Sequence, residues 1–135
     1  MISQSAPRVY MEGMPPEALA QVAAYFQALS EPTRLQILNH LRRGERNVGE
    51  LATLCGCTAA NISRHLAMLA QHGLVERESR RTSVYYRIAD PSTYELCDFV
   101  CGSIARRIER SALEGSVFVQ AVNRPNTAKR GTRVG

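Results

Sequence analysis

The stretch TAANISRHLAMLAQHGLVERESRRTSVYYRI, residues 58–88, decides the fold of this chain. Its first part places Ile62, Leu66 and Leu69 at helical spacing, so one face of a helix can be buried while small and polar side chains cover the other faces. Gly73 follows, and glycine is the residue that most often ends a helix. The sequence therefore predicts an amphipathic helix that starts near Thr58 and stops at Gly73.

A β-hairpin is predicted directly after this helix. Leu74 and Val75 open a strand, and the charged run of residues 76–81 is expected to form the turn. In residues 84–88, side chains suited to a buried face alternate with polar ones, as in a half-buried return strand. A helix with a small, polar and cationic face beside an arginine-bearing hairpin suits DNA.

Two more helices are predicted upstream. Pro32 fits the first turn of one helix, whose pattern ends at Gly44. Asn47, with Glu50 three residues later, has the signature of a capping box for a shorter helix that turns at Gly56. The apolar face of the first helix consists of Leu35, Leu38 and Leu41.

These elements predict a mostly α-helical fold with a small β-hairpin, a winged helix-turn-helix whose reading helix begins at Thr58. Arginine presents a planar fork that pairs with guanine or phosphate, and small alanine side chains can approach thymine methyl groups. His65 is open to two interpretations, a DNA contact or a packing side chain. The predicted DNA-binding residues on the helix and hairpin are Thr58, Ala59, Ala60, Asn61, Ser63, Arg64, His65, Arg80, Arg81 and Arg87.

Four segments in this order resemble the ArsR/SmtB family of small dimeric bacterial repressors over roughly residues 19–110: LSEPTRLQIL, ELATLCG, ISRHLAMLAQHGLV and VYYRIAD. The resemblance implies a homodimer joined through its first and last helices. It also implies that the two recognition helices enter successive major grooves of an imperfect palindromic operator in double-stranded DNA, and that an inducer relieves repression. The chain departs from the family pattern in the wing, where residues 80–83 stand where the family often has a glycine.

Three regions are expected along the chain. Residues 1–16 form a mobile N-terminal arm, and residues 113–135 form a basic C-terminal tail that is largely disordered, because neither has the periodic apolar residues of a packed element. Residues 17–112 form the winged-helix domain for DNA binding and dimerisation. Within it, residues 17–29 and 92–110 carry apolar stripes at helical spacing and are predicted to be helices.

Composition narrows the class of protein. The chain has 17 Lys and Arg against 12 Asp and Glu, but the surplus lies mostly in the tail, so DNA affinity depends on the placement of charge. Neither an apolar run of about 18 residues nor a secretory leader is visible, which predicts a cytoplasmic protein that contacts no membrane. An enzyme is not expected, since the chain lacks a glycine-rich phosphate loop, HExxH, a nucleophile elbow and a thioredoxin-type CxxC.

The four cysteines form two pairs. Cys97 and Cys101 are four residues apart on a predicted helix, so both thiols share one face, separated by roughly 6 Å of rise. Cys55 and Cys57 flank the glycine before the reading helix. All four are candidate ligands of a thiophilic ion, Cys97 and Cys101 ahead of the other pair, and structural disulfides are not expected in the cytoplasm. The competing interpretation is packing, because free cysteine is often buried.

The sequence does not identify the inducer. The family's characteristic metal and persulfide sites do not carry over, because the aligned positions mostly hold side chains without the required thiol or imidazole. Thiolate pairs favour a thiophilic metal or metalloid ion such as arsenite, antimonite or cadmium, whereas low-pKa thiols would suit an oxidant or reactive sulfur species. A nonsensing DNA-binding module is the third alternative. No cofactor is expected to be required for DNA binding. The positions that lack the family's ligands are Asn39, Asn47, Gly49, Ala52, Ser92 and Ser103.

Overall fold

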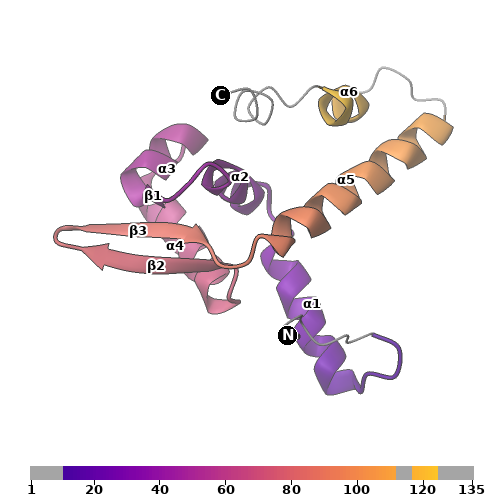
Figure 1. The fold of residues 1–135 in the computed structure, drawn as a ribbon, viewed down its shortest axis with the longest axis horizontal. Helices are drawn as coiled ribbons and strands as arrows, with labels where there is room; N and C mark the ends of the chain where they lie inside the picture. The colour runs from indigo at the N-terminus through magenta and orange to yellow at the C-terminus, as the bar shows by residue number, and fades with distance from the viewer. Residues whose placement is uncertain (1–10, 112–116, 125–135) are drawn as a thin grey trace, which may run out of the picture. The chain divides into compact units, whose positions relative to one another are not determined.

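The computed structural model describes residues 11–111 and 117–124 (Figure 1). The chain divides into two compact units between Asp90 and Pro91. The first contains α1 (Pro16–Ala28), α2 (Pro32–Leu41), β1 (Arg46–Asn47), α3 (Val48–Cys55), α4 (Ala59–Gln71), β2 (Val75–Arg80) and β3 (Ser83–Ile88), and the second contains α5 (Ser92–Arg110) and α6 (Val117–Asn123).

Side-chain caps start the three helices of the reading head. The Glu31 carboxylate accepts a hydrogen bond from the backbone N–H of Arg34 at the start of α2. Asn47 and Glu50 form a complete capping box on α3, as the sequence predicted. At the start of α4, Thr58 Oγ1 accepts from the backbone N–H of Asn61 at 3.1 Å. Each cap satisfies a backbone donor that the first helical turn leaves without an intrahelical partner.

The core of the first unit lies where α3, α4 and the sheet meet. The predicted apolar stripe of α4 is confirmed, because its three members are fully buried, and α4 packs against α3 and β2. The largest fully buried side chains are Ile37, Leu51, Ile62, Leu66, Leu69 and Leu74. They come from α2, α3, α4 and the entry to β2, so one cluster ties the reading helix to the rest of the unit.

The sheet has three antiparallel strands in the order β1–β3–β2. The predicted position of the turn was wrong: β2 continues to Arg80, which pairs with Ser83, so only Arg81 and Thr82 connect the strands. Glutamates of β2 form ion pairs with Arg87 of β3, which lets the charged run pair as a strand. The short strand β1, which pairs with the middle of β3, was not predicted.

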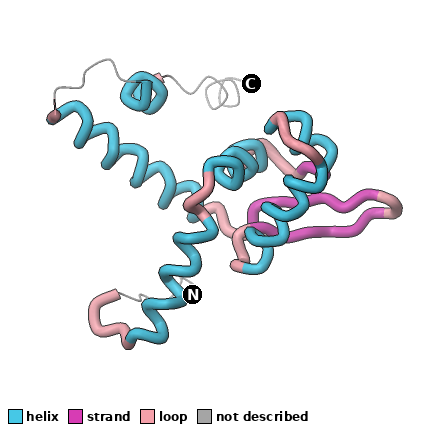
Figure 2. Tube along the Cα trace, turned by 180° about the vertical axis from the view of Figure 1, so that it is seen from behind, coloured by secondary structure: helices cyan, strands magenta, loops and turns pink. Residues whose placement is uncertain are grey.

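The hairpin turn contains no glycine. Arg81 adopts φ 54°, in the left-handed region that usually favours glycine or asparagine. The tight connection therefore places an arginine in a conformation that costs free energy for a side-chain-bearing residue. Figures 1 and 2 show that β2 and β3 project beyond the helices of this unit and that the turn is the far end of the projection.

The second unit begins with the long helix that the sequence predicted over the same residues, Ser92–Arg110. It also contains α6, Val117–Asn123, inside the tail for which composition predicted disorder. The remainder of that tail, residues 113–116 and 125–135, and residues 1–10 of the predicted N-terminal arm lie outside the described residues. No helix in the described part of the chain is both long enough and apolar enough to cross a membrane.

Candidate nucleic-acid interface and thiol sites

The recognition helix α4 presents a row of small and polar side chains. Ala59, Ala60, Ser63 and Arg64 are exposed, while the cap residue Thr58 is exposed at the start of the helix. The opposite face is the buried apolar stripe. The helix therefore has an inner apolar side and an outer side of small, polar and cationic residues. The outer side carries no large apolar side chain near the N-terminus of α4, which is the part of a recognition helix that contacts base edges.

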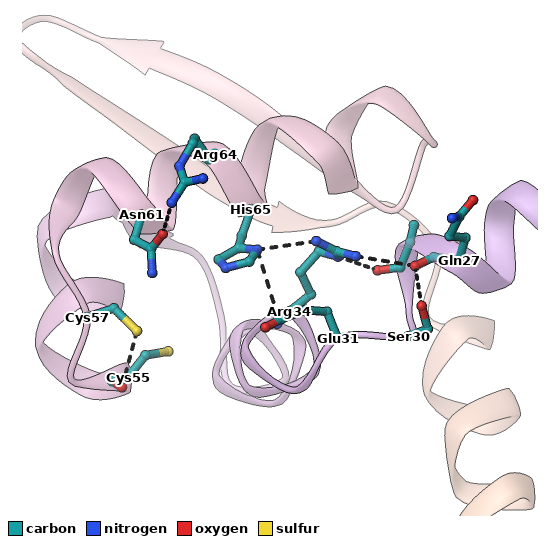
Figure 3. Close-up of polar contacts among 10 residues, drawn as sticks. Gln27, Ser30, Glu31, Arg34, Cys55, Cys57, Asn61, Arg64 and His65 are labelled. Carbon is teal, nitrogen blue, oxygen red and sulfur yellow. Dashed lines mark hydrogen bonds and ion pairs between the residues drawn. The ribbon is translucent and has the colours of Figure 1, made fainter.

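Arg64 is held in place by its own helix. Its guanidinium donates a hydrogen bond to Asn61 Oδ1, one turn earlier, and Asn61 is half-buried (Figure 3). Guanidinium has five donors, so this contact leaves donors for a guanine edge or a phosphate. The pair restricts the rotamers of the Arg64 side chain, so less conformational entropy would be lost if the guanidinium bound a further partner.

His65, the neighbour of Arg64, faces the body of the protein. Its side chain is 16% exposed, and Nδ1 lies 3.3 Å from a terminal nitrogen of Arg34 and 3.9 Å from Glu31 Oε1. Arginine only donates, so a hydrogen bond here requires an unprotonated Nδ1, and a protonated ring would pair with Glu31 instead. Figure 3 shows Arg64 and His65 leaving α4 in different directions. The contacts favour the packing interpretation of His65.

Arg34 connects three helices. Its Nε donates to the carbonyl oxygen of Ala28 at 2.6 Å, and a terminal nitrogen donates to the carbonyl oxygen of Gln27 at 3.3 Å. Both carbonyls belong to the last turn of α1, and that of Gln27 also accepts hydrogen bonds from the N–H and the hydroxyl of Ser30. Desolvation acts to raise the pKa of Glu31, but the N–H of Arg34 and the His65 imidazole outweigh it and lower that pKa. The sequence pattern gave no sign of this cluster, since its members are far apart along the chain.

The wing carries a ladder of alternating charges. Arg80 pairs with Glu45 and with Glu78, at 3.1 Å for the second pair, and its guanidinium lies 4.8 Å from the ring centroid of Tyr85. Arg87 pairs with Glu78 at 3.0 Å and with Glu76 at 3.2 Å. Hydrogen bonding and charge from Arg80 and Arg87 lower the pKa of Glu78, and Glu45 and Glu78 raise that of Arg80.

The ladder separates the wing arginines into two kinds. Arg80 and Arg87, both predicted DNA contacts, are already bound to glutamates, so reaching a phosphate would require exchange of these ion pairs. Arg77 and Arg81 are exposed and take part in no ion pair that the structure describes within residues 11–111. Of these two cations, Arg81 is the one that stands at the tip of the hairpin.

Cys55 and Cys57 lie on either side of the left-handed Gly56, at the junction of α3 and α4. Both are half-buried, and Cys57 Sγ lies 3.6 Å from the carbonyl oxygen of Cys55 (Figure 3). Burial and the neighbouring Cys57 raise the pKa of the Cys55 thiol. The structure thus brings this predicted pair together at one turn.

Cys97 and Cys101 lie on α5, one helical turn apart, and both are half-buried. The residues between them include Phe99, which is 77% exposed, and Val100, which is 45% exposed. No disulfide forms among the four cysteines, all of which the structure describes. Across the described ranges, no group of three or more histidine, cysteine or carboxylate side chains could hold a metal ion within one chain.

Comparison with known proteins decides the family. A sequence model named "Helix-turn-helix domain" matches residues 29–78. The HTH-type transcriptional regulator NmtR of Mycobacterium tuberculosis is 38% identical over 82 residues, which are 61% of this chain and 68% of that protein. The solution structure of a homodimeric winged helix-turn-helix domain from Mycobacterium bovis, described as a possible ArsR-family regulator, superposes with a TM-score of 0.63. It is 36% identical, and the match covers 74% of this chain and 95% of that domain.

The chain belongs to the ArsR/SmtB family. Members of this family that it resembles are DNA-binding transcriptional regulators, not enzymes, and the predicted fold and family are confirmed. A probable mercury resistance operon repressor of Streptomyces lividans is also similar, 34% identical over 74 residues. That match covers 55% of this ArsR-family chain and 59% of the mercury repressor.

Proposed function

We propose that this ArsR-family protein is a homodimeric repressor that releases its operator when a thiophilic metal or metalloid ion binds Cys97 and Cys101. The operator is an imperfect palindrome in double-stranded DNA. Each α4 enters a major groove and the wing approaches the adjacent backbone. The exposed small residues of α4 and the preoriented Arg64 support the DNA-reading role. The homodimeric state of the Mycobacterium bovis domain supports a dimer.

The observation that carries the sensing role is the exposure of the two thiols on α5. Cys97 and Cys101 share one helical face and are half-buried, so they are not part of a closed core. Cysteine thiolates prefer soft ions. One chain supplies only two of these ligands, whereas two α5 helices that meet in a dimer supply four, enough for an ion that requires three or four. Binding would then change how the subunits cross, and with that the spacing of the recognition helices.

The relatives support a thiophilic inducer only by analogy. The Streptomyces lividans relative is named for mercury resistance, and mercury is a soft ion. This chain has its own arrangement of thiols, so the choice among arsenite, antimonite and cadmium rests on experiment. Since the ion replaces the thiol protons, the response should strengthen as pH rises toward a free thiol's pKa of about 8.5.

The test is operator binding by the reduced protein, titrated with arsenite, antimonite, cadmium and, separately, an oxidant. We expect one of the ions to weaken binding at least tenfold in the wild-type protein and in C55S/C57S, because the α5 thiols are intact in both. C97S/C101S should bind the operator normally and should not respond. A response to the oxidant alone would support redox sensing, and full ion response by C97S/C101S would refute the proposed site.

A further inference from the structure

The turn before the recognition helix is a rigid frame that contains two thiols. The N–H of Cys57 donates to the carbonyl oxygen of Ala52 at 3.0 Å, and the N–H of Gly56 donates to that of Thr53 at 3.3 Å. These two bonds, with Gly56 at φ 67°, make a Schellman motif at the end of α3. Cys55 and Cys57 lie inside the closed hydrogen-bonded loop, so their backbone positions are held relative to each other.

Both thiols are accessible from this frame. Cys55 and Cys57 are half-buried, whereas the core position of the same helix, Leu51, has 0% exposure. Packing therefore does not account for both side chains. The Sγ atom of Cys57 turns back to within 3.6 Å of the Cys55 carbonyl oxygen, and Figure 3 shows both sulfur atoms at the same turn.

The chemistry of this pair favours a bridging ligand over a single reactive thiol. Burial and the neighbouring Cys57 raise the pKa of Cys55, so less thiolate is present at neutral pH and simple alkylation or oxidation is slow. A ligand that bonds to both sulfur atoms gains from their fixed proximity, because the second bond forms at a high effective concentration. No large loss of backbone entropy opposes it, since the Schellman motif already fixes the turn.

We infer that Cys55 and Cys57 form a dithiol site for a soft electrophile that takes two sulfur ligands, such as a monosubstituted trivalent arsenical. With phenylarsine oxide as the probe, the arsenic atom forms two As–S bonds, its oxygen leaves as water with the two thiol protons, and no electrons are transferred. The product is a ring closed through the Cys55–Gly56–Cys57 backbone. This site is separate from Cys97 and Cys101, and it needs ligands from one subunit only.

The position of the site connects it to DNA reading. Cys57 directly precedes Thr58, whose hydroxyl caps α4 through the N–H of Asn61, and Asn61 in turn orients Arg64. A ring across the turn constrains the residue that leads into this cap. We expect bridging to reduce operator affinity at least fivefold without dissociating a dimer, an effect that rests on the DNA-binding part of the proposed function.

The test uses full-length C97S/C101S, in which Cys55 and Cys57 are the only remaining thiols. We expect one phenylarsine oxide per protomer, detected by mass spectrometry, with both thiols protected from a thiol-counting reagent. The adduct should survive excess 2-mercaptoethanol and be removed by 2,3-dimercaptopropanol. The matched control is the same C97S/C101S protein with C55S and C57S added, which retains no thiol and should bind no probe.

Two single variants distinguish loss of the dithiol site from loss of the folded structure. The single changes C55S and C57S, each made in the C97S/C101S background, should keep the circular dichroism and melting profile of the parent, yet form only adducts that 2-mercaptoethanol reverses. Stable binding by either single variant, or no stable binding by the parent, would overturn the site. A stable adduct that leaves operator affinity unchanged would overturn its link to DNA reading. Neither result bears on ion sensing by Cys97 and Cys101, which the C55S/C57S protein tests independently.

Discussion

Adjacent residues on α4 have different surroundings. His65 contacts Arg34 and Glu31 inside the first unit, whereas Arg64 is exposed and donates a hydrogen bond to Asn61 of its own helix. A helix advances by about 100° per residue, so neighbours in sequence necessarily face different directions. This geometry allows one residue to fix the helix to the protein while the next remains available for DNA.

Arg64→Ala should weaken operator binding by about 1–3 kcal/mol if the guanidinium contacts a guanine in bidentate fashion. The loss should be confined to one base pair of each half-site, because only that pair loses its reader. Binding to operators with every substitution at that position, measured at matched salt, checks this. The control is Arg107→Ala on α5, which should leave operator affinity unchanged. If the two variants bind the operator equally well, Arg64 does not contact DNA.

Cys55 should react slowly with iodoacetamide at neutral pH. Its raised pKa, caused first by burial and then by Cys57, means that the reactive thiolate becomes abundant only above the ordinary cysteine pKa of about 8.5. The alkylation rate against pH, followed on the Cys55 peptide by mass spectrometry, should have its midpoint above that value. In C57S the midpoint should fall part of the way back, and a midpoint below about 8.5 in the wild type would contradict the assignment.

At the scale of elements, the wing is stiffened by its own charges. The ion pairs of Arg87 join β3 to β2, and the contact between Arg80 and Glu45 joins β2 to the residue before β1. Each exposed pair contributes little alone, but the shared carboxylate of Glu78 makes them a network. The tip residue Arg81, like Arg77, is outside the described ion pairs, so it can meet phosphate without giving up a glutamate partner.

Arg81→Ala should lower the dependence of log affinity on log salt by about one phosphate equivalent, since one condensed counterion fewer is released. Arg80→Ala should change that slope less, because its charge is already neutralised by Glu45 and Glu78. Both are measured by operator binding between about 50 and 200 mM salt. Sequence preference should persist in both variants, and a larger slope change for Arg80→Ala would show that its ion pairs open on DNA.

Arg34 of α2 joins three helices through its side chain, because it contacts the end of α1 and His65 of α4. Arg34→Gln removes the charged donor from the carbonyl oxygens of Gln27 and Ala28 and the contact with His65, so the free energy of unfolding should fall by about 1–3 kcal/mol. Chemical denaturation followed by circular dichroism measures this. Arg43→Gln, at an exposed position in the loop after α2, is the control and should be nearly neutral. Equal stability of the two variants would mean that the α1 carbonyls find other donors.

At the scale of the whole molecule, the exposed apolar residues of α5 require a partner in the proposed dimer. Phe99 is 77% exposed, which is unusual for a large aromatic side chain unless a second surface covers it. It lies two residues from each candidate sensing cysteine and, at about 100° per residue, on the opposite face of α5, so its loss tests subunit packing separately from thiol chemistry.

Phe99→Ala should weaken dimerisation by about 2 kcal/mol or more, roughly 30-fold in the dissociation constant, if the ring is an interface anchor. Analytical ultracentrifugation over a range of concentrations measures this. Leu54→Ala is the matched control, because Leu54 is 46% exposed but lies on α3 of the reading head, and its loss should leave the dimer intact. Two variants with the same dissociation constant would place the interface elsewhere.

Local sequence predicted much of this architecture because caps and apolar spacing act over a few residues. The capping box of Asn47 and Glu50, the buried stripe of α4 and both ends of α5 could be read from neighbouring residues alone. Among the candidate site residues, the exposure of Arg64 follows from its place opposite the buried stripe. The reading head therefore needed no tertiary information to be located.

Other features depend on residues that only folding brings together. The strand β1 needs the backbone of β3 some forty residues later, and the charged run extends as a strand to Arg80 only because it pairs with β3 as far as Ser83. Arg34 meets His65 across 31 positions and Arg80 meets Glu45 across 35, separations at which no local pattern exists. The sequence by itself determined which helices form and which faces they bury, because those preferences are local, whereas tertiary structure decided which arginines remain free for DNA, because charged side chains choose partners by proximity in space.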